Sequence, residues 1–432
     1  MIDAVGHVNS AIGIGQQLAS AGHKVSFLIT SQWAPIIESY GFQVIQYSIR
    51  ANNNNNNVDE DPGKIWAQVC IDEGYFTDRS PLDKMISVKT MRMKAWFDDL
   101  KLMDPIIKRI INDDDDDQQR PDCIVLDHFH TVPSVVASGI PWVWISSVSP
   151  LFLFDDNRVP PPGSGLSSLI SDKSEWSAFR TAINDSTSDL WHQFNNYCLA
   201  QGCNESLPEY QYFYPSPYLN LYVYPRELNY QEYRPLPENY RGLDNFMRHE
   251  LTTVDKQQFE IPEPLSDKPG KLIYFSLGSM GAINLVIMKR LISILAKSAH
   301  RFIVAKGLLH REFDLPDNMW GLSTVSQIQV LPIVDLVITH GGNNTVAETM
   351  YFGKPMIVLP MFLDQYDNAQ RLADQGLGLR LDVYNCTEWQ LLTAIENVLN
   401  NREMQRKLLK ISQRIQTDNT IKDIPLLFEK SY

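Results

Sequence analysis

Short apolar runs alternate with amphipathic stretches through the first third of the chain. Apolar residues at helical spacing predict a helix over 9–22, and the apolar runs 24–30 and 41–49 predict strands. Further on, a polar-faced helix is predicted over roughly 83–103. The elements predicted after it are a strand over 123–127, a helix over 131–139 and a strand over 141–148. Because strands that alternate with helices pair in parallel, the pattern predicts a doubly wound α/β sheet.

A second α/β series begins near residue 270. Its helices are predicted to start near Asn284 and Asn344, with more helices toward the C-terminus. Its predicted strands cover 272–279, 301–307, 335–342, 355–360 and 377–382. Between the two series, residues 150–217 are rich in aromatic residues and proline without clear periodicity. Such a composition is typical of mobile helices and loops that cover an apolar pocket, and residues 218–224 then predict a strand.

Two domains are therefore expected, and a chain of 432 residues that is 44% hydrophobic can bury two cores. We predict an N-terminal domain over 1–246, a polar, proline-rich linker over 247–268 and a C-terminal domain over 269–415. Residues 416–432 are predicted to pack back toward the N-terminal domain. Two doubly wound domains leave a cleft between the carboxyl ends of their strands, where we expect the chemistry. The runs Asn52–Asn57 and Asp113–Asp117 are interpreted as loop insertions.

Charge and composition exclude several classes of partner. The formal net charge of −13 disfavours nucleic acids and anionic membranes, which the overall field would repel. The five cysteines have no metal-ligand spacing and are interpreted as reduced. No stretch approaches about 20 apolar residues, and the first residues lack the pattern of a secretory signal, so we expect no membrane span and a cytoplasmic monomer.

The most informative passage covers residues 335–370. Its apolar strand stops at His340, two glycines allow a tight turn, and Asn344 and Thr345 are predicted to open a helix whose free N–H groups point back at the strand end. Such a turn can bind an anion. His340 would add a donor to a diphosphate oxygen, and Glu348 could accept both hydroxyls of a ribose. A purely structural turn, and a helix N-cap at Asp364, are the alternative interpretations.

In order and at matching spacing, this passage supplies His340, Gly342, Asn344, Thr345, Glu348, Gly353, Pro355, Asp364 and Gln365. The series resembles the donor-binding signature of the family-1 UDP-glycosyltransferases. That resemblance implies a GT-B fold, in which two Rossmann-like domains face each other across a cleft. It also implies UDP-sugar as donor, with the diphosphate at residues 340–345 (Asn343 included), the ribose at Glu348 and the sugar at Asp364 and Gln365.

The family resemblance extends to three shorter stretches. Residues 276–279 match the family's Ser-x-Gly-Ser turn, so Ser279 would contact a phosphate. Val325 and Gln327 belong to the stretch that holds the base. Thr324 stands where many relatives have a tryptophan that stacks on uracil; Trp320 is either a substitute or a structural residue.

On the acceptor side, residues 6–9 resemble the family's entry to the first helix, which places His7 as general base. Asp127, at the end of its strand, resembles the carboxylate that orients this base. Taken alone, His7 reads as a helix-terminal polar residue and Asp127 as a strand-end cap. His128 and His130 are interpreted mainly as solvated or lining residues, with acceptor contact as the alternative.

The resemblance implies an inverting transfer of a hexose, glucose in our prediction, from a UDP-sugar to a hydroxyl of a small lipophilic acceptor. We expect no metal and no cofactor, since the UDP-sugar is a co-substrate, and we expect a role in detoxification or storage. In relatives an apolar strand precedes the segment equivalent to Met1–His7 and lies in the centre of the N-terminal sheet. Either the recorded start is too late, or the chain is a catalytically impaired binder of UDP-sugar or lipophile. An epimerase that acts on UDP-sugar alone is the third alternative, and acceptor dependence separates it.

Overall fold

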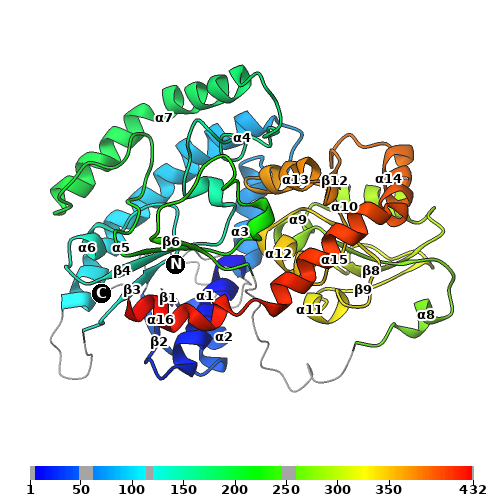
Figure 1. The fold of residues 1–432 in the computed structure, drawn as a ribbon, viewed down its shortest axis with the longest axis horizontal. Helices are drawn as coiled ribbons and strands as arrows, with labels where there is room; N and C mark the ends of the chain where they lie inside the picture. The colour runs from blue at the N-terminus through cyan, green and yellow to red at the C-terminus, as the bar shows by residue number, and fades with distance from the viewer. Residues whose placement is uncertain (1–4, 48–61, 113–119, 245–258, 431–432) are drawn as a thin grey trace.

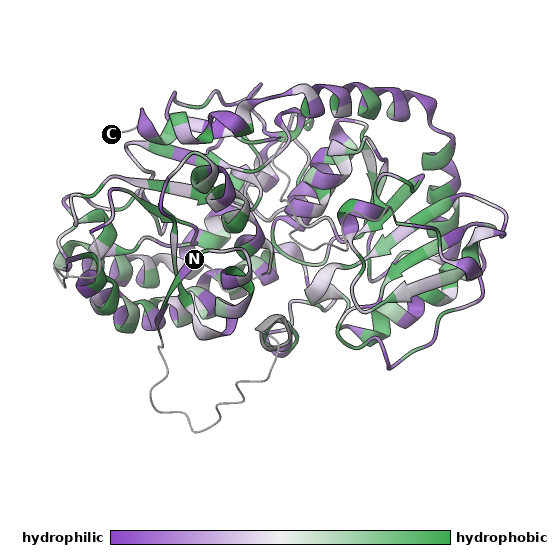
Figure 2. Cartoon of the chain, turned by 90° about the horizontal axis from the view of Figure 1, so that it is seen from below, coloured by the Kyte–Doolittle hydropathy of each residue, from purple (hydrophilic) through white to green (hydrophobic). Residues whose placement is uncertain are grey.

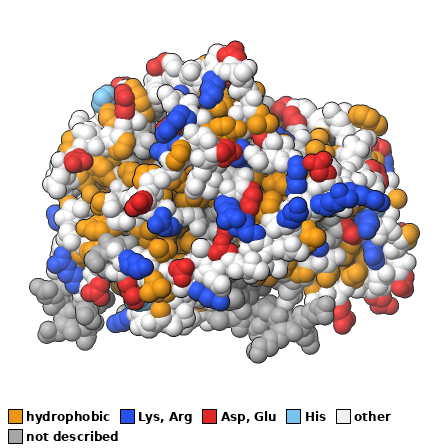
Figure 3. Space-filling view, in the orientation of Figure 1, with side chains coloured by type: hydrophobic (Ala, Val, Ile, Leu, Met, Phe, Trp, Pro, Cys, Tyr) orange, Lys and Arg blue, Asp and Glu red, His pale blue; other side chains and the backbone are white. Residues whose placement is uncertain are grey.

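The computed structural model describes residues 5–47, 62–112, 120–244 and 259–430, which form two lobes side by side (Figure 1). The asparagine and aspartate runs predicted as loop insertions lie outside the described residues. In Figure 2 the strands are mostly hydrophobic and the outer faces of the surrounding helices are mostly hydrophilic, as expected for sheets covered by amphipathic helices. Acidic and basic side chains are interspersed over the face shown in Figure 3.

The C-terminal lobe is built on one six-stranded parallel sheet with the order β12-β11-β10-β7-β8-β9. All residues of β7, β10 and β11 are buried, which explains why these strands read as continuous apolar runs. The strands are β7 (Leu272–Ser276), β8 (Arg301–Ala305), β9 (Met319–Leu322), β10 (Leu336–Thr339), β11 (Met356–Val358) and β12 (Gly378–Arg380). The helices are α8 (Glu263–Ser266), α9 (Gly278–Gly281), α10 (Leu285–Leu295), α11 (Gln327–Val330), α12 (Asn343–Tyr351), α13 (Gln365–Asp374), α14 (Glu388–Asn400), α15 (Arg402–Thr417), η6 (Thr420–Asp423) and α16 (Ile424–Glu429).

The N-terminal lobe holds a four-stranded parallel sheet with the order β3-β4-β5-β6 and a two-stranded parallel sheet, β1-β2. The strands are β1 (Ser26–Thr30), β2 (Gln43–Tyr47), β3 (Ile124–Leu126), β4 (Trp142–Ser146), β5 (Leu219–Tyr222) and β6 (Tyr240–Gly242). The longer helices are α1 (Val5–Ser20), α3 (Pro62–Asp72), α5 (Met93–Asn112) and α7 (Ser174–Ala200). The shorter ones are η1 (Ser31–Trp33), α2 (Ala34–Ser39), α4 (Pro81–Ser87), η2 (Val88–Arg92), α6 (Pro133–Val136), η3 (Pro150–Phe152) and η4 (Arg226–Leu228).

Helix α1 holds the two N-terminal sheets together. Val8 and Ile12 pack with the β1 residues Phe27 and Ile29, whereas Ile14 and Leu18 pack with apolar residues of β4 and β5. The central strand that the family resemblance leads one to expect has no counterpart among the described residues, where β1 and β3 each have one strand neighbour. The helix that carries His7 therefore provides the packing between these sheets.

The last helix lies on the N-terminal lobe, as Figure 1 shows for α16 beside α1. Ile424 and Phe428 of α16 are buried with Ile14 and Leu18 of α1. Nearer the lobe boundary, Arg414 of α15 donates two hydrogen bonds to the Glu227 carboxylate, at 2.8 and 2.6 Å. The chain therefore crosses between the lobes twice, once between residues 244 and 259 and once after α15.

Several elements differ from the prediction. The single helix predicted over 83–103 is α4, a π-helical turn (η2) and α5 in succession. The region over 150–217 contains α7, a helix of 27 residues that its weak apolar periodicity did not reveal. Strands β6 and β9, both at sheet edges, were also missed. The short helix α8 lies inside the segment predicted as a linker, so that segment is not wholly irregular.

Candidate functional site

The predicted phosphate turn lies where the C-terminal sheet changes direction. Strands β7 and β10 are neighbours, with Thr339 paired to Ser276 at their carboxyl ends, and their following segments leave toward opposite sides. Parallel α/β sheets bind ligands at such switch points. Gly341 has φ of +84°, which permits the turn, and Gly342 is the N-cap of α12. The helix begins at Asn343, one residue earlier than predicted, and its first N–H groups lie at this switch point.

The imidazole of His340 is enclosed by two glycines. A Cβ on Gly278 would lie 2.6 Å from this ring, and a Cβ on Gly342 would lie 2.5 Å from Nε2. Burial lowers the pKa of His340 to about 4, against a backbone hydrogen bond at Ser276 that raises it. His340 is therefore neutral near pH 7, and it can offer one N–H donor to a phosphate oxygen without adding a charge.

The residues predicted for the base and ribose form one polar group. Nε2 of Gln327 donates to Oε2 of Glu348, and the Thr345 hydroxyl donates to Oε1 of Gln327 at 3.4 Å. Val325 is buried beside this stretch, whereas Ser279 is exposed in α9. The structure thus brings Gln327 of α11 together with Thr345 and Glu348 of α12.

Trp320, considered as a substitute for the missing tryptophan, lies on the edge strand β9. Its ring packs edge-on against Phe259, with centroids 6.0 Å apart. This contact gives the indole a structural role in the C-terminal lobe.

The residues predicted for the sugar contact the protein itself. The buried Asp364 accepts hydrogen bonds from the Ser149 N–H at 3.2 Å and from Asn368 at 3.3 Å. Burial raises the pKa of Asp364 to about 6. Oε1 of Gln365 accepts from the N–H groups of Met361 and Phe362 and so fixes the loop before α13.

His7 and Asp127 meet in the N-terminal lobe. Nδ1 of His7 lies 2.8 Å from Oδ1 of Asp127, and both side chains are buried. The other carboxylate oxygen accepts from the Ser147 hydroxyl at 2.9 Å. Ser147 was not predicted, but it follows β4, the strand beside β3, so strand pairing placed it next to Asp127. Phe129 supports the imidazole edge-on at 5.7 Å.

Two asparagines of α12 connect the phosphate turn to the N-terminal lobe. Nδ2 of Asn344 donates to the Gly6 carbonyl at 3.1 Å, one residue before His7, and the Ser10 hydroxyl donates to Oδ1 of Asn344 at 3.4 Å. Nδ2 of Asn343 donates to the Val223 carbonyl at 2.7 Å. Both side chains were predicted as diphosphate ligands; in the structure each binds the N-terminal lobe, and Asn344 does so beside His7.

A pocket of about 850 Å³, counting its part open to solvent, adjoins His7. His7, Asp127 and His128 line it, together with apolar and aromatic side chains from both flanks of β4 and Leu363 from the C-terminal lobe. His130 is buried and is not a lining residue, but its ring contacts that of His128, with centroids 3.8 Å apart and the ring planes at 52°. Burial lowers the pKa of both histidines, that of His130 to about 4. The pocket wall is therefore mostly uncharged near pH 7.

Among the residues that the structure describes, no group of three or more His, Cys, Asp or Glu side chains could hold a metal ion. None of the described helices combines the length and apolar character needed to cross a bilayer.

Known proteins match both the N-terminal and the C-terminal half of the chain. Residues 267–427 match the family described as UDP-glucoronosyl and UDP-glucosyl transferase. The UDP-glucuronosyltransferase 2A2 of Mus musculus is 26% identical over 319 residues, which cover 66% of this chain and 55% of the mouse protein. The sterol 3-beta-glucosyltransferase of Saccharomyces cerevisiae (strain YJM789) is 23% identical over 443 residues, covering 98% of this chain and 34% of the yeast protein. The chain thus spans about half the length of the first relative and about a third of the second.

Solved structures establish the fold. The glycotransferase of kitacinnamycin superposes with a TM-score of 0.69 at 16% identity, covering 99% of this chain and 96% of the other. The spinosyn rhamnosyltransferase SpnG, complexed with thymidine diphosphate, gives a TM-score of 0.62 at 18% identity, with 99% and 98% covered. These likenesses confirm the predicted GT-B fold of two Rossmann-like lobes. The chain is thus similar to the UDP-glucoronosyl and UDP-glucosyl transferase family over residues 267–427, and it has the GT-B fold.

Proposed function

We propose that this protein transfers a hexose, with glucose as the first candidate, from a UDP-sugar to a hydroxyl of a small lipophilic acceptor, with inversion at the anomeric carbon. His7 is the general base of this proposal, and Asp127 orients it. The observation that carries the proposal is the buried His7–Asp127 contact of 2.8 Å at the wall of an apolar pocket.

The hydrogen bonds around His7 favour the tautomer that a base needs. A carboxylate only accepts hydrogen bonds, so the contact with Asp127 keeps the imidazole proton on Nδ1. Nε2 then has a free lone pair for the proton of the acceptor hydroxyl. The Ser147 hydroxyl and the pairing of β3 with β4 fix Asp127, so that the imidazole keeps its orientation.

The donor end of the reaction would use the C-terminal switch point. The first N–H groups of α12 and the neutral His340 would stabilise the negative charge of the departing UDP. The hydrogen bonds of Asn344 to Gly6 and Ser10 place this turn close to His7, as a direct displacement requires. The names of the relatives give glucuronate for the mouse protein and glucose with a sterol for the yeast protein, which is compatible with a lipophilic acceptor.

The test is release of UDP from UDP-glucose in the presence and absence of phenolic and alcoholic acceptors. We expect release that depends on acceptor, and its loss in His7→Ala by a factor on the order of 10²–10⁴, with UDP binding by calorimetry unchanged. UDP binding without turnover in the wild type would identify a sugar-nucleotide or lipophile binder instead. Acceptor-independent conversion of the UDP-sugar would identify an epimerase. The cytoplasmic location and the role in detoxification or storage stay predictions.

A further inference from the structure

Two lysines on the helical segment that runs from α4 through η2 to α5 have opposite surroundings. Nζ of Lys84 donates to the Met361 carbonyl at 2.9 Å and to the hydroxyls of Tyr366 and Tyr384 at 2.8 and 3.3 Å. An ammonium has three N–H donors, so those of Lys84 are fully used within the protein. Lys84 is a structural residue between the lobes.

Lys89, five residues later, lines the pocket beside His7. Its Nζ lies 5.6 Å from the centroid of the Tyr212 ring. Among the described residues, none accepts a hydrogen bond from this ammonium. The flanking pocket residues Met85, Val88 and Met93 are apolar and buried. Lys89 is half-buried, and its ammonium, at an apolar pocket wall and without an acceptor in the part of the chain that the structure describes, is available to an anionic ligand; this makes Lys89 a candidate ligand-binding residue.

The backbone at Lys89 is itself unusual. Residues Val88–Arg92 form a π-helical turn within an otherwise α-helical segment. Such turns cost hydrogen-bond geometry and occur frequently at functional sites, because they rotate a side chain away from the position that a regular helix would give it. Here the side chain that the turn carries into the pocket wall is a lysine.

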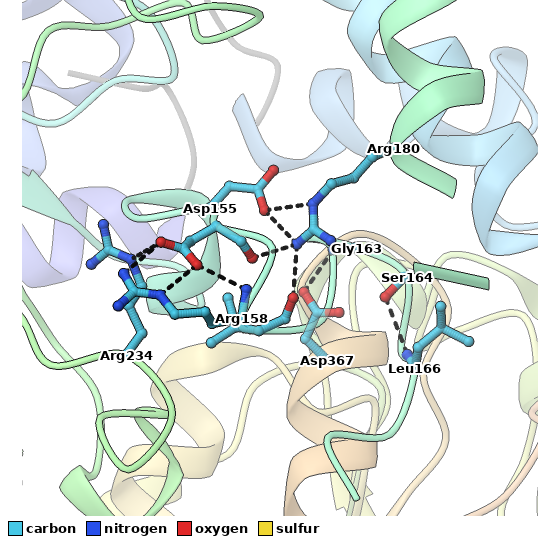
Figure 4. Close-up of polar contacts among 10 residues, drawn as sticks. Asp155, Arg158, Gly163, Ser164, Leu166, Arg180, Arg234 and Asp367 are labelled. Carbon is cyan, nitrogen blue, oxygen red and sulfur yellow. Dashed lines mark hydrogen bonds and ion pairs between the residues drawn. The ribbon is translucent and has the colours of Figure 1, made fainter. Parts of the chain in front are cut away.

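The carboxylate of Asp155 makes no ion pair with Lys89 among the described residues. Asp155 also lines the pocket, but its Oδ1 accepts from Nε and Nη2 of Arg180 at 3.1 and 2.8 Å (Figure 4). The same guanidinium donates to the carbonyls of Asp156 and Val159, both at 2.8 Å. Arg180 therefore holds Asp155 in a network of its own. Burial lowers the pKa of Lys89, and the charge of Asp155 acts against that decrease.

The other ionisable groups of the pocket that could compete with Lys89 for an anion are either paired or uncharged. His7 and Asp127 are paired with each other, and burial keeps His128 neutral near pH 7. Tyr212 keeps its proton, because burial raises its pKa. An anionic group in this pocket would thus find one free ammonium among apolar walls.

We propose that Lys89 binds an anionic group, a carboxylate or a sulfate, on an acceptor whose apolar body fills the pocket and whose hydroxyl reaches His7. This inference rests on the proposed function, since it names the class of acceptor for the same site. An ammonium and an anion that meet in an apolar wall pair strongly, whereas a neutral ester would leave the lysine unpaired. A site of this kind discriminates charged from neutral acceptors more sharply than an apolar wall discriminates size.

The experiment compares saturated ω-hydroxy fatty acids of roughly 8–16 carbons with their methyl esters and with ω-hydroxyalkyl sulfates of matching length. We expect kcat/KM for an anionic acceptor to exceed that for the ester by roughly 10–100-fold in the wild type. In Lys89→Met this preference should disappear or reverse, with turnover of the ester retained. Lys94→Met is the matched control, because Lys94 is an exposed lysine of α5 that pairs with Asp98, and its loss should leave the preference unchanged. Carboxylate and sulfate arms show which anion the site prefers.

A binding measurement separates this inference from the proposed function. Trp96 and Trp144 line the pocket, so quenching of tryptophan fluorescence reports acceptor binding without turnover. If no form of the protein releases UDP, anion-selective binding that requires Lys89 would still support this inference, while the proposed function would fall. A wild type that binds the ester as tightly as both anions would overturn it, as would a Lys89→Met variant that keeps the anion preference. The first comparison needs no variant, so it holds even if the substitution impairs folding.

Discussion

The two lobes position their site residues in different ways. The C-terminal lobe has one sheet of six parallel strands, and its donor-side residues follow neighbouring strands at the switch point. In the N-terminal lobe the described strands form sheets of four and two, and α1 packs against both. His7 lies on that helix, and its neighbour Gly6 is held by Asn344 of the other lobe. The donor-side residues are therefore positioned by neighbouring strands of one sheet, whereas the base lies on a helix that packs against two sheets and is also held by a contact from the other lobe.

The largest expected effect comes from a substitution that impairs the acceptor side alone. In Asp127→Asn the amide can present its NH₂ group to His7 and favour the wrong imidazole tautomer. We expect kcat to fall by a factor on the order of 10²–10⁴, while the affinity for UDP stays at the wild-type value. Steady-state UDP release and calorimetry measure the two quantities. Ser147→Ala, which keeps the carboxylate, is the graded control and should cost about 10-fold or less. Loss of UDP binding in Asp127→Asn would contradict the separation of the two sides.

The next largest effect comes from a substitution that impairs the donor side alone. Removal of the Glu348 carboxylate in Glu348→Ala should weaken UDP binding by roughly 10–100-fold, because charge-assisted hydrogen bonds to the ribose would be lost. The affinity for 2′-deoxy-UDP should fall less than that for UDP, since one of the hydroxyls is already missing. Calorimetry with both nucleotides gives the comparison. Acceptor binding, followed by tryptophan fluorescence, should not change.

A smaller effect sharpens the role of the enclosed imidazole. Gly342 has φ of −60°, so alanine fits its backbone, but the added Cβ would lie 2.5 Å from Nε2 of His340. We expect Gly342→Ala to displace this ring, to lower the free energy of unfolding by about 1–3 kcal/mol and to weaken UDP binding about 10-fold. Urea denaturation and calorimetry measure these changes. A variant with unchanged UDP affinity would remove His340 from the donor site.

The last effect, which leaves the chemistry of the site unchanged, concerns pH and the contact between the lobes. Asp367 of α13 accepts the N–H groups of Gly163 and Gly165 at 2.7 and 3.0 Å, and Figure 4 shows it beside Gly163. Burial raises the pKa of Asp367 from 3.8 to about 8. The folded protein then keeps a proton that the unfolded chain has released, so this group's contribution to stability is lost as pH rises from about 4 to about 8.

Asparagine at this position cannot titrate but still offers an oxygen to both N–H groups. We expect the free energy of unfolding of Asp367→Asn to decrease less between about pH 5 and about pH 8 than that of the wild type. Urea denaturation at both pH values measures the difference. Asp98→Asn, which removes an exposed carboxylate, should follow the wild-type curve. Parallel curves for the wild type and Asp367→Asn would show that Asp367 ionises freely in the folded state.

Buried strands of both lobes could be predicted from the sequence, whereas the edge strands β6 and β9 and the helix α7 could not. The buried strands β7, β10 and β11 are continuous apolar runs, and they were predicted close to their true positions. The pairing of β10 with β7 then placed His340 at the switch point as expected. In contrast, α7 has little apolar periodicity, because its buried residues are spread along 27 positions. No pattern in the sequence indicated the π-helical turn.

The residues of the candidate site could be predicted where they match segments of the family that the chain resembles. His7 and Asp127, which are 120 positions apart, were joined through the family resemblance, and the structure places them in contact. The protein partners of Asp364 and Asn344 could not be predicted, because they depend on how one lobe docks on the other. Lys89 was missed for a similar reason, since an isolated lysine in a helix looks like a solvated residue until the pocket around it is known.

The double crossing of the chain between the lobes limits how they can move. The second of these connections is packed on the N-terminal lobe, because Arg414 binds Glu227 and the α16 helix is buried against α1. Opening to admit a ligand should therefore leave α16 on the N-terminal lobe, so that the C-terminal lobe moves relative to it about the segment that follows α15.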